Sequence, residues 1–325
     1  MKTQMRYGTV PYVDLPVSRV VFGTTQPMVR GEDVCELLDT VYAAGINTFD
    51  SAASYGEAEA SLGHWIRSRG NRKEIVLLTK GANPYPWRQR LTEYDILHDI
   101  ENSFAKLGTD YIDVYILHRD DPDVPVGPIV ELLNKLHQKG KIGAFGGSNW
   151  TLKRILEANQ YAEEHHLIPF TVCSPSFSLA ECIGDPWGGS VTISGEKNRD
   201  FRTWLKENEM PVFAYSSLAR GFFSGRLKSS ETERAKELLG PAAEEYGYPV
   251  NFERLRKAEQ LAQEKRKTVS QIAFSWLMHQ ELNLFGITAP GSKEHILSTV
   301  EALFLPLSKE ELDWLSGSPA GLSTS

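Results

Sequence analysis

The feature of this chain that most constrains its fold is a regular alternation of short apolar segments with longer amphipathic ones. Eight segments have the length and apolar content of buried strands. They cover residues 18–22, 47–49, 75–79, 111–117, 141–147, 170–173, 212–215 and 284–287. Between them, apolar residues recur every three or four positions, which predicts amphipathic helices. Strands that alternate with helices pair in parallel, because each helix carries the chain back across the sheet.

Eight strand–helix units predict a closed barrel. The predicted helices cover residues 32–43, 57–69, 92–107, 128–138, 151–165, 201–207, 252–264 and 269–279. We therefore predict the α/β class and a (β/α)8 TIM barrel. A hairpin at 7–15 is expected to cover the bottom of the barrel, and a closing helix is expected at 309–316. No low-complexity linker divides the chain, so residues 1–325 are expected to form a single domain.

Composition and charge exclude several classes of protein. The formal net charge is −7, and no run of Lys and Arg is long enough to follow a phosphate backbone, which argues against nucleic acid as a partner. No segment approaches the roughly 20 apolar residues of a membrane span, and residues 1–13 lack the apolar core of a signal peptide. We therefore expect a cytoplasmic protein. Cys35, Cys173 and Cys182 are scattered without metal-ligand spacing, so we expect reduced packing thiols and no metal site.

Four polar residues stand where predicted strands end in loops: Asp50, Tyr55, Lys80 and His118. In a parallel barrel the carboxyl ends of the strands surround the substrate pocket. Taken singly, each residue has an ordinary explanation, such as a turn-forming Asp, a packed Tyr or His, or a solvated Lys. Together, at three successive strand ends, they favour proton-transfer chemistry.

Long insertions follow three strands on the same rim of the predicted barrel. They cover residues 81–91, 178–198 and 218–249. Trp87, Trp150 and Trp187 lie on or just after rim loops, with Tyr85 and Arg119 nearby. Such aromatic rings stack on a sugar face or an aromatic aldehyde, although packing of the loop onto the barrel explains them equally well. The substrate-binding prediction therefore comprises Trp87, Arg119, Trp150 and Trp187, with residues 185–189 as a shaped lid.

Six short motifs in a fixed order are similar to those of the aldo-keto reductases, and within them to bacterial reductases related to potassium-channel β subunits. The motifs are FDSAASYG at 49–56, LTK at 78–80, DVYILH at 113–118, GSNW at 147–150, AYSSL at 214–218 and APGSK at 289–293. The resemblance extends over nearly the whole chain. It implies hydride transfer between a nicotinamide cofactor and the carbonyl group of a small molecule.

The resemblance also implies roles for the four strand-end residues. An alkoxide forms when a carbonyl group accepts a hydride, so a proton donor is needed near its oxygen, and Tyr55 is the candidate. A nearby ammonium favours the phenolate, so Lys80 is expected to lower the pKa of Tyr55. Asp50 is expected to hold Lys80 through a salt bridge. His118 is expected to donate a hydrogen bond to the carbonyl oxygen.

The cofactor implied by the resemblance is NADP, with NAD as the alternative. Ser148 and Asn149 are expected to bind the carboxamide, and Phe177 is expected to stack on the nicotinamide where most relatives carry Tyr. The other expected cofactor contacts are Ser174, Tyr215, Ser216, Leu218, Arg226, Gly291, Ser292 and Lys293. Lys293 beside Ser292 favours a 2′-phosphate, but a lysine cannot make the bidentate contacts of an arginine. The chain departs from many relatives at Ser174 and near Thr299, where those relatives have Gln and Asn.

Three functions remain open from the sequence. The first is a reductase or alcohol dehydrogenase for aldehydes, ketones or sugar-like carbonyl compounds. The second is a cofactor-sensing regulatory protein like the channel β subunits. The third is an aldolase that forms a Schiff base on Lys80, which requires a neutral lysine that Asp50 would oppose. The intact set of four residues favours the enzyme that transfers hydride.

Overall fold

Eight parallel strands close into a barrel in the computed structural model, which describes residues 5–185 and 188–317. In chain order they are β3 (Val20–Gly23), β4 (Thr48–Asp50), β5 (Val76–Gly81), β6 (Ile112–Leu117), β7 (Ile142–Ser148), β8 (Val172–Ser174), β9 (Val212–Ala214) and β10 (Leu284–Thr288). Each strand pairs with the next, and β10 closes the barrel on β3 with Gly286 opposite Val20. The predicted (β/α)8 TIM barrel is confirmed.

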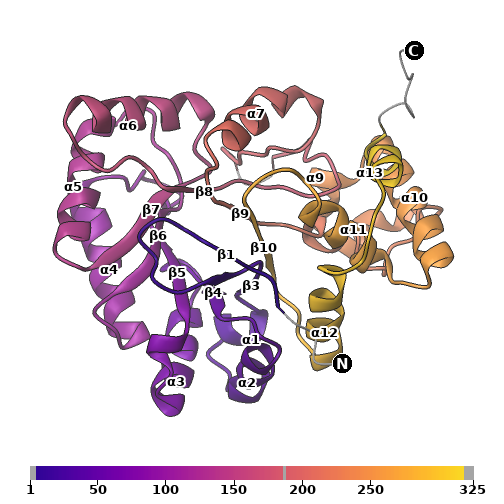
Figure 1. Ribbon diagram of the computed structural model, residues 1–325, viewed down its shortest axis with the longest axis horizontal. Helices are drawn as coiled ribbons and strands as arrows, with labels where there is room; N and C mark the ends of the chain where they lie inside the picture. The colour runs from indigo at the N-terminus through magenta and orange to yellow at the C-terminus, as the bar shows by residue number, and fades with distance from the viewer. Residues whose placement is uncertain (1–4, 186–187, 318–325) are drawn as a thin grey trace.

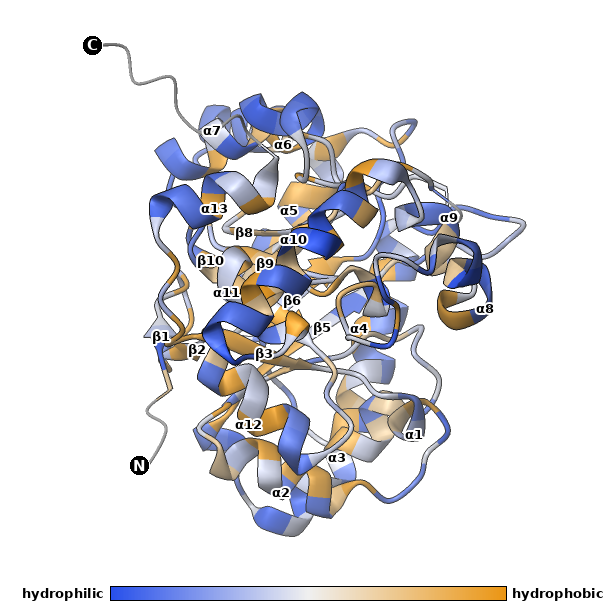
Figure 2. Cartoon of the chain, turned by 90° about the vertical axis from the view of Figure 1, so that its right-hand side faces the viewer, coloured by the Kyte–Doolittle hydropathy of each residue, from blue (hydrophilic) through white to orange (hydrophobic). Residues whose placement is uncertain are grey.

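Amphipathic helices surround this barrel (Figure 1). They are α2 (Cys35–Ala43), α3 (Ala58–Arg69), α4 (Glu93–Leu107), α5 (Val126–Gln138), α6 (Leu152–Glu164), α7 (Arg199–Glu207), α10 (Pro249–Lys265), α11 (Val269–Met278) and α12 (Lys293–Ala302). Hydrophilic residues cover the outer helix surfaces, and apolar residues follow the central strands (Figure 2). None of the helices in the described part of the chain has the length and apolar character needed to span a bilayer.

Local chemistry sets where these helices begin and end. The Thr92 hydroxyl accepts a hydrogen bond from the Asp95 N–H at the start of α4, and Gly108 ends that helix in the left-handed conformation. Helix α2 begins three residues later than predicted, because the Asp33 carboxylate accepts a hydrogen bond from the Cys35 N–H. Helix α10 begins three residues earlier than predicted, at Pro249, whose ring suits the first helical position.

An N-terminal hairpin lies across one end of the barrel (Figure 1). Strand β1 (Tyr7–Gly8) pairs antiparallel with β2 (Val17–Ser18), so the second strand of the hairpin lies beyond the predicted 7–15 range. Val10 and Val17 pack with residues of the barrel strands in a separate apolar cluster. The hairpin therefore closes the amino-terminal end of the barrel and leaves the opposite rim for ligands.

The opposite rim carries the three long insertions predicted from the sequence. The insertion after β9 contains two short helices, α8 (Ala235–Leu239) and α9 (Ala242–Tyr246). Another short helix, α1 (Gln26–Val29), follows β3, and α13 (Lys309–Ser316) packs against α10 near the end of the chain.

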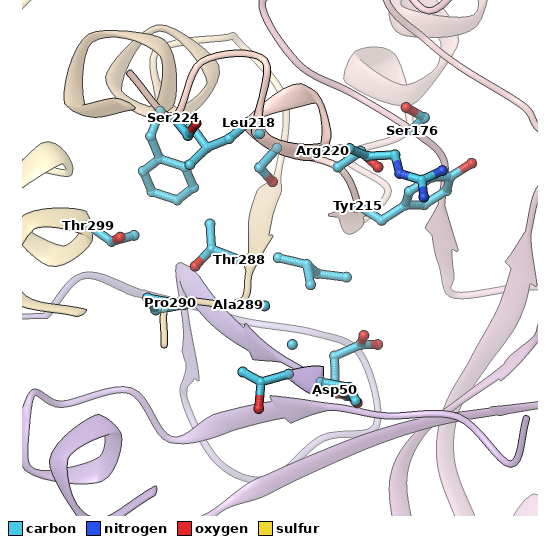
Figure 3. Close-up of a pocket in the computed structure, with 18 of the residues that line it drawn as sticks. Asp50, Ser176, Tyr215, Leu218, Arg220, Ser224, Thr288, Ala289, Pro290 and Thr299 are labelled. Carbon is cyan, nitrogen blue, oxygen red and sulfur yellow. Dashed lines mark hydrogen bonds between the residues drawn. The ribbon is translucent and has the colours of Figure 1, made fainter. Parts of the chain in front are cut away.

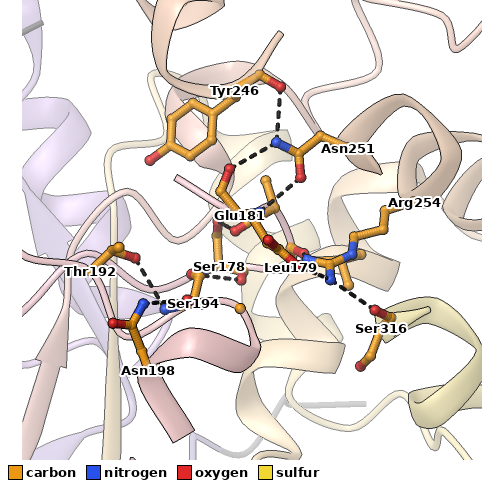
Figure 4. Close-up of polar contacts among 12 residues, drawn as sticks. Ser178, Leu179, Glu181, Thr192, Ser194, Asn198, Tyr246, Asn251, Arg254 and Ser316 are labelled. Carbon is orange, nitrogen blue, oxygen red and sulfur yellow. Dashed lines mark hydrogen bonds and ion pairs between the residues drawn. The ribbon is translucent and has the colours of Figure 1, made fainter. Parts of the chain in front are cut away.

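Polar contacts hold the base of the insertion that follows β8 (Figure 4). Arg254 of α10 donates to the Leu179 carbonyl at 2.8 Å and to Glu181 Oε1 at 2.6 Å. Asn251 donates to the carbonyls of Glu181 and Tyr246, and its own Oδ1 accepts the Glu181 N–H. These hydrogen bonds fix Leu179 and Glu181, at the base of the insertion, to α10.

Candidate active site

A cavity of about 1170 Å³ opens at the carboxyl ends of the barrel strands. Asp50, Tyr55, Lys80 and His118 all line it, so the structure brings together the four residues predicted from strand ends. Figure 3 shows Asp50 below Thr288, which ends β10, and below Ala289 and Pro290, which follow it. Leu218 and Ser224, from the segment after β9, lie above them.

Lys80 and Asp50 form a buried ion pair at the floor of the cavity. Lys80 Nζ donates to Asp50 Oδ1 at 2.5 Å and to the Ser51 carbonyl at 2.8 Å. The two side chains are 3% and 6% exposed, so water does not screen the pair. Burial alone lowers the pKa of Lys80, but the charges of Asp50 and Tyr55 outweigh this and raise it. Lys80 therefore stays an ammonium at neutral pH.

Tyr55 lies above this ammonium, in the loop between β4 and α3. Lys80 Nζ is 5.0 Å from the centroid of the phenol ring. Burial raises the pKa of Tyr55, and the charges of Lys80 and Arg119 oppose that rise without cancelling it. This corrects the expected lowering of the pKa, because the desolvation of a phenolate outweighs the attraction of one ammonium. The phenol is consequently protonated at neutral pH and available as a donor.

His118 faces Tyr55 at the end of β6. The two rings meet edge to face with centroids 5.5 Å apart, and Nδ1 lies 3.4 Å from Ser54 Oγ. Burial, together with the charges of Lys80 and Arg119, holds the pKa of His118 well below its ordinary value. A neutral imidazole carries one N–H, so His118 can donate one hydrogen bond into the cavity without adding charge.

Asn149 is the centre of a polar cluster on the neighbouring wall. Its Nδ2 donates to the His118 carbonyl at 3.2 Å and to Ser148 Oγ at 3.0 Å. Its Oδ1 accepts from the Tyr215 hydroxyl at 2.7 Å and from the Val191 N–H at 3.1 Å. The backbone of Asn149 is in the left-handed region, with φ of 60°, which turns the side chain back toward these partners.

Comparison with known proteins decides the family. The sequence profile of the Aldo/keto reductase family matches residues 19–317. This chain belongs to the aldo/keto reductase family.

Individual aldo/keto reductases and related enzymes are similar along most of their length. Aldo-keto reductase YhdN of Bacillus subtilis is 28% identical, over 89% of this chain and 87% of the relative. A norsolorinic acid reductase of Aspergillus flavus is 29% identical, over 85% and 69%. An aryl-alcohol dehydrogenase of Pestalotiopsis microspora is 26% identical, over 85% and 70%. The protein is thus an oxidoreductase that acts on carbonyl groups, and its family uses NAD(P)H.

Other residues of the cavity lining fit such a dinucleotide. The hydroxyls of Thr25 and Thr288 line the cavity, are buried, and have no hydrogen-bond partner in the described part of the chain. Beside Gly291 there is open space, with no atom within 4 Å of where a Cβ would lie. Arg226 supplies a cation to the same wall. Unsatisfied donors, open backbone and a positive charge suit the ribose and phosphate groups of a nicotinamide dinucleotide.

Three predicted contacts of this reductase are buried away from the cavity. Phe177 is 1% exposed and packs edge to face on Trp276 of α11, with centroids 5.8 Å apart. Ser174 is 0% exposed and donates to the Phe213 carbonyl. Trp150 is 2% exposed and packs edge to face on Phe170, with the Arg154 guanidinium of α6 over its ring. We correct these placements: the aromatic residue that lines the cavity beside Asn149 is Tyr215.

The other predicted substrate residues lie in different places relative to the cavity. Trp87 is 79% exposed, stacks on Tyr85 with centroids 5.2 Å apart, and does not line the cavity. Trp187, with Pro186 of the predicted lid, lies outside the described residues. Arg119 lines the cavity. The sequence analysis chose Arg119 because it lies near the aromatic residues of the rim loops.

Some of the remaining predicted cofactor residues line the cavity and others do not. Ser148, Ser216, Leu218, Arg226 and Gly291 line the cavity, as does Thr299. Ser292 and Lys293 do not, because the Ser292 hydroxyl accepts the His295 N–H and begins α12.

Several lining residues were not identified from the sequence. They include Thr25, Cys182, Ser190, Arg220, Glu245, Gln271, His295 and Ser298. His295, Ser298 and Thr299 lie on one face of α12, and this helical spacing could have identified them from the sequence. Cys182 was expected to be a packing thiol, but it lines the cavity.

Proposed function

We propose that this enzyme is an NADP-linked reductase, working reversibly as an alcohol dehydrogenase, for aldehydes, ketones or sugar-like carbonyl compounds. The observation that carries the proposal is the set at the cavity floor: a charged Lys80 paired with Asp50, a protonated Tyr55 above it, and a neutral His118 beside it. Each chemical role in carbonyl reduction is filled by a group in the protonation state that the role requires.

The four residues act together on the carbonyl oxygen. The bound nicotinamide supplies a hydride to the carbonyl carbon. As negative charge develops on the oxygen, His118 donates a hydrogen bond to it and Tyr55 transfers its phenol proton. The Lys80 ammonium stabilises the resulting phenolate, and Asp50 holds that ammonium in position and charged. In the reverse direction the same phenolate removes the alcohol proton.

Residues of the neighbouring wall position the cofactor ring. The Ser148 hydroxyl and the Asn149 amide can exchange their present partners for a carboxamide, and Tyr215 offers the ring face for stacking. Arg226 lines the cavity and is assigned to the diphosphate that both cofactors share, and Lys293 is the first residue of α12, two positions after Gly291. Lys293 at the adenosine end supports NADP over NAD, because only NADP carries the 2′-phosphate.

Aromatic aldehydes and ketones are the first substrates to test. Relatives named aryl-alcohol dehydrogenase and norsolorinic acid reductase support this choice. A panel of aliphatic, aromatic and sugar aldehydes is offered with NADPH or NADH, and the loss of reduced-nicotinamide absorbance is followed. We expect reduction of at least one aromatic aldehyde, faster with NADPH. Failure of every carbonyl compound with both cofactors would contradict the proposal.

The aldolase alternative finds no support in the state of Lys80. A Schiff base needs a neutral amine as nucleophile, and the raised pKa of Lys80 opposes that form. Borohydride treatment in the presence of an aldehyde should therefore leave Lys80 unmodified, as checked by mass spectrometry.

A further inference from the structure

Positive charge exceeds negative charge in the cavity lining. The lining cations with permanent charge are Lys80, Arg119, Arg220 and Arg226, and the lining carboxylates are Asp50 and Glu245. Asp50 is paired with Lys80, and Glu245 is paired with Arg220 at 2.7 Å. Across residues 5–185 and 188–317, neither Arg119 nor Arg226 makes an ion pair. This excess is local, since the whole chain has a net charge of −7.

The two remaining arginines lie in different parts of the cavity. Arg226 is in the segment after β9, where its guanidinium contacts Ser224. Arg119 follows His118 directly at the end of β6, and its charge acts on the pKa of Tyr55, His118 and Tyr215. Arg226 therefore belongs with the cofactor wall, and Arg119 belongs with the reacting groups.

Arg119 has few partners for a half-buried guanidinium. Its one hydrogen bond in the described part of the chain is a long contact of 3.4 Å from Nη1 to Ser190 Oγ. The Ser190 N–H is held by Asp185 at 3.1 Å, but Asp185 makes no ion pair with Arg119. A guanidinium has five N–H donors, and a partly desolvated one gains most from a carboxylate that accepts two of them. Four of the five donors make no hydrogen bond to the residues that the structure describes.

We propose that Arg119, assisted by the Ser190 hydroxyl, binds a carboxylate of the substrate. The preferred substrates are then aldehydes or ketones that also carry a carboxylate, with the carbonyl group facing Tyr55 and His118. This inference rests on the proposed function, since it assigns a substrate class to the same site. The reaction is unchanged: the carboxylate takes no part in the proton or hydride transfer.

The test compares matched pairs of substrates that differ only in charge. One pair is para-carboxybenzaldehyde and its methyl ester, and a second pair is succinic semialdehyde and its methyl ester. The ratio of kcat/KM for the acid to that for the ester is measured with NADPH. We expect a ratio of about tenfold or more in favour of the acid, because a charge-assisted hydrogen bond strengthens substrate binding by about that factor. The difference should lie mainly in KM.

Variants at Arg119 separate charge from shape. Arg119→Gln keeps a polar side chain without the charge, and the ratio should fall to about one or below. Arg119→Lys should retain part of the preference, and Ser190→Ala should reduce it by roughly threefold or less, as a neutral hydrogen bond predicts. The ester is the internal reference, because losing the Arg119 charge also changes the pKa of Tyr55. Arg226→Gln is the matched control, since it should slow acid and ester equally.

Each outcome decides between the claims. If the parent enzyme reduces the esters at least as well as the acids, or if the preference survives in Arg119→Gln, the carboxylate assignment is wrong while the proposed function stands. If a phosphorylated aldehyde is preferred over both acids and Arg119→Gln removes that preference, the anion is a phosphate and the carboxylate assignment is overturned. If neither acid nor ester is reduced but another carbonyl compound of the panel is, this inference fails alone; if no carbonyl compound is reduced with either cofactor, the proposed function fails with it.

Discussion

The two ends of the cavity are built differently. At the catalytic end, Asp50 and Lys80 come from adjacent barrel strands and are held by contacts of 2.5 to 2.8 Å before any ligand binds. Along the proposed cofactor wall, Thr25 and Thr288 have buried hydroxyls without a hydrogen-bond partner among the described residues, and Gly291 faces open space. The catalytic groups are preorganised by the barrel, whereas the cofactor wall leaves polar groups for the ligand to satisfy. Changes at the two ends should therefore affect different steps.

Lys80→Met should have the largest effect, and it should slow the chemical step without weakening cofactor binding. Methionine fills similar space without charge, so the pKa of Tyr55 rises further and the phenolate loses its counter-ion. We expect kcat for carbonyl reduction to fall by about 10²–10⁴-fold. NADPH affinity, measured by quenching of protein fluorescence, should change little. A matching loss of cofactor binding would show that the two ends are not separate.

Trp150→Ala tests whether the barrel wall beside the site depends on packing. The buried indole lies against Phe170, and removing it should lower the free energy of unfolding by about 3–5 kcal/mol. Trp87→Ala is the control. Trp87 is exposed, so apart from the loss of its stacking on Tyr85 this substitution should lower the free energy of unfolding by less than about 0.5 kcal/mol. Urea unfolding measures both. Equal losses would contradict the corrected placement of Trp150.

Lys293→Ala and Arg226→Gln should sharpen the description of the cofactor wall. If Lys293 contacts the 2′-phosphate, its loss lowers the affinity for NADPH by about tenfold and leaves the affinity for NADH nearly unchanged. Arg226→Gln should weaken both cofactors if Arg226 contacts the shared diphosphate. Titration of each variant with both cofactors distinguishes these patterns. Equal binding of NADPH and NADH by the parent protein would contradict the NADP assignment.

The smallest expected effect is that of pH across the neutral range. Tyr55 has a raised pKa and His118 has one well below its ordinary value, so both keep one protonation state near neutrality. Reduction needs the protonated phenol, so kcat/KM should stay level from about pH 6.5 upward and fall only above about pH 10. A clear inflection near pH 6.5 would mean that His118 titrates normally.

The barrel and its catalytic end could be predicted because one rule places both. Apolar strands alternate with helices, and a polar residue that ends such a strand, such as Lys80, lies at the ligand rim whatever the loops do. The direction of a side chain that lies beyond the strand end is harder to predict from the sequence. Trp150 follows Asn149, whose left-handed backbone turns the chain, and the indole folds back onto Gly147 in the barrel wall.

Loop residues were predicted less well because direction in a loop depends on tertiary contacts. Phe177 lies three residues past Ser174, and only the position of Trp276 on α11 shows that its ring points into the helix layer. Ser292 reads equally as a phosphate contact or a helix cap, and in the structure its hydroxyl begins α12. Glu245 and Cys182 reach the cavity from distant insertions, which no local pattern reveals.

The most direct test of the account is the rate of the chemical step in Tyr55→Phe. Phenylalanine keeps the ring beside His118 and removes only the proton donor. With NADPH bound and an aldehyde in excess, rapid mixing measures the single-turnover rate, and a parallel titration measures NADPH affinity. We predict a rate lower by about 10²–10⁴-fold with unchanged affinity, and no comparable further loss when Lys80→Met is added, because the two residues act as one unit. A variant that reduces the aldehyde at near the parental rate would contradict the assignment of Tyr55 as the proton donor.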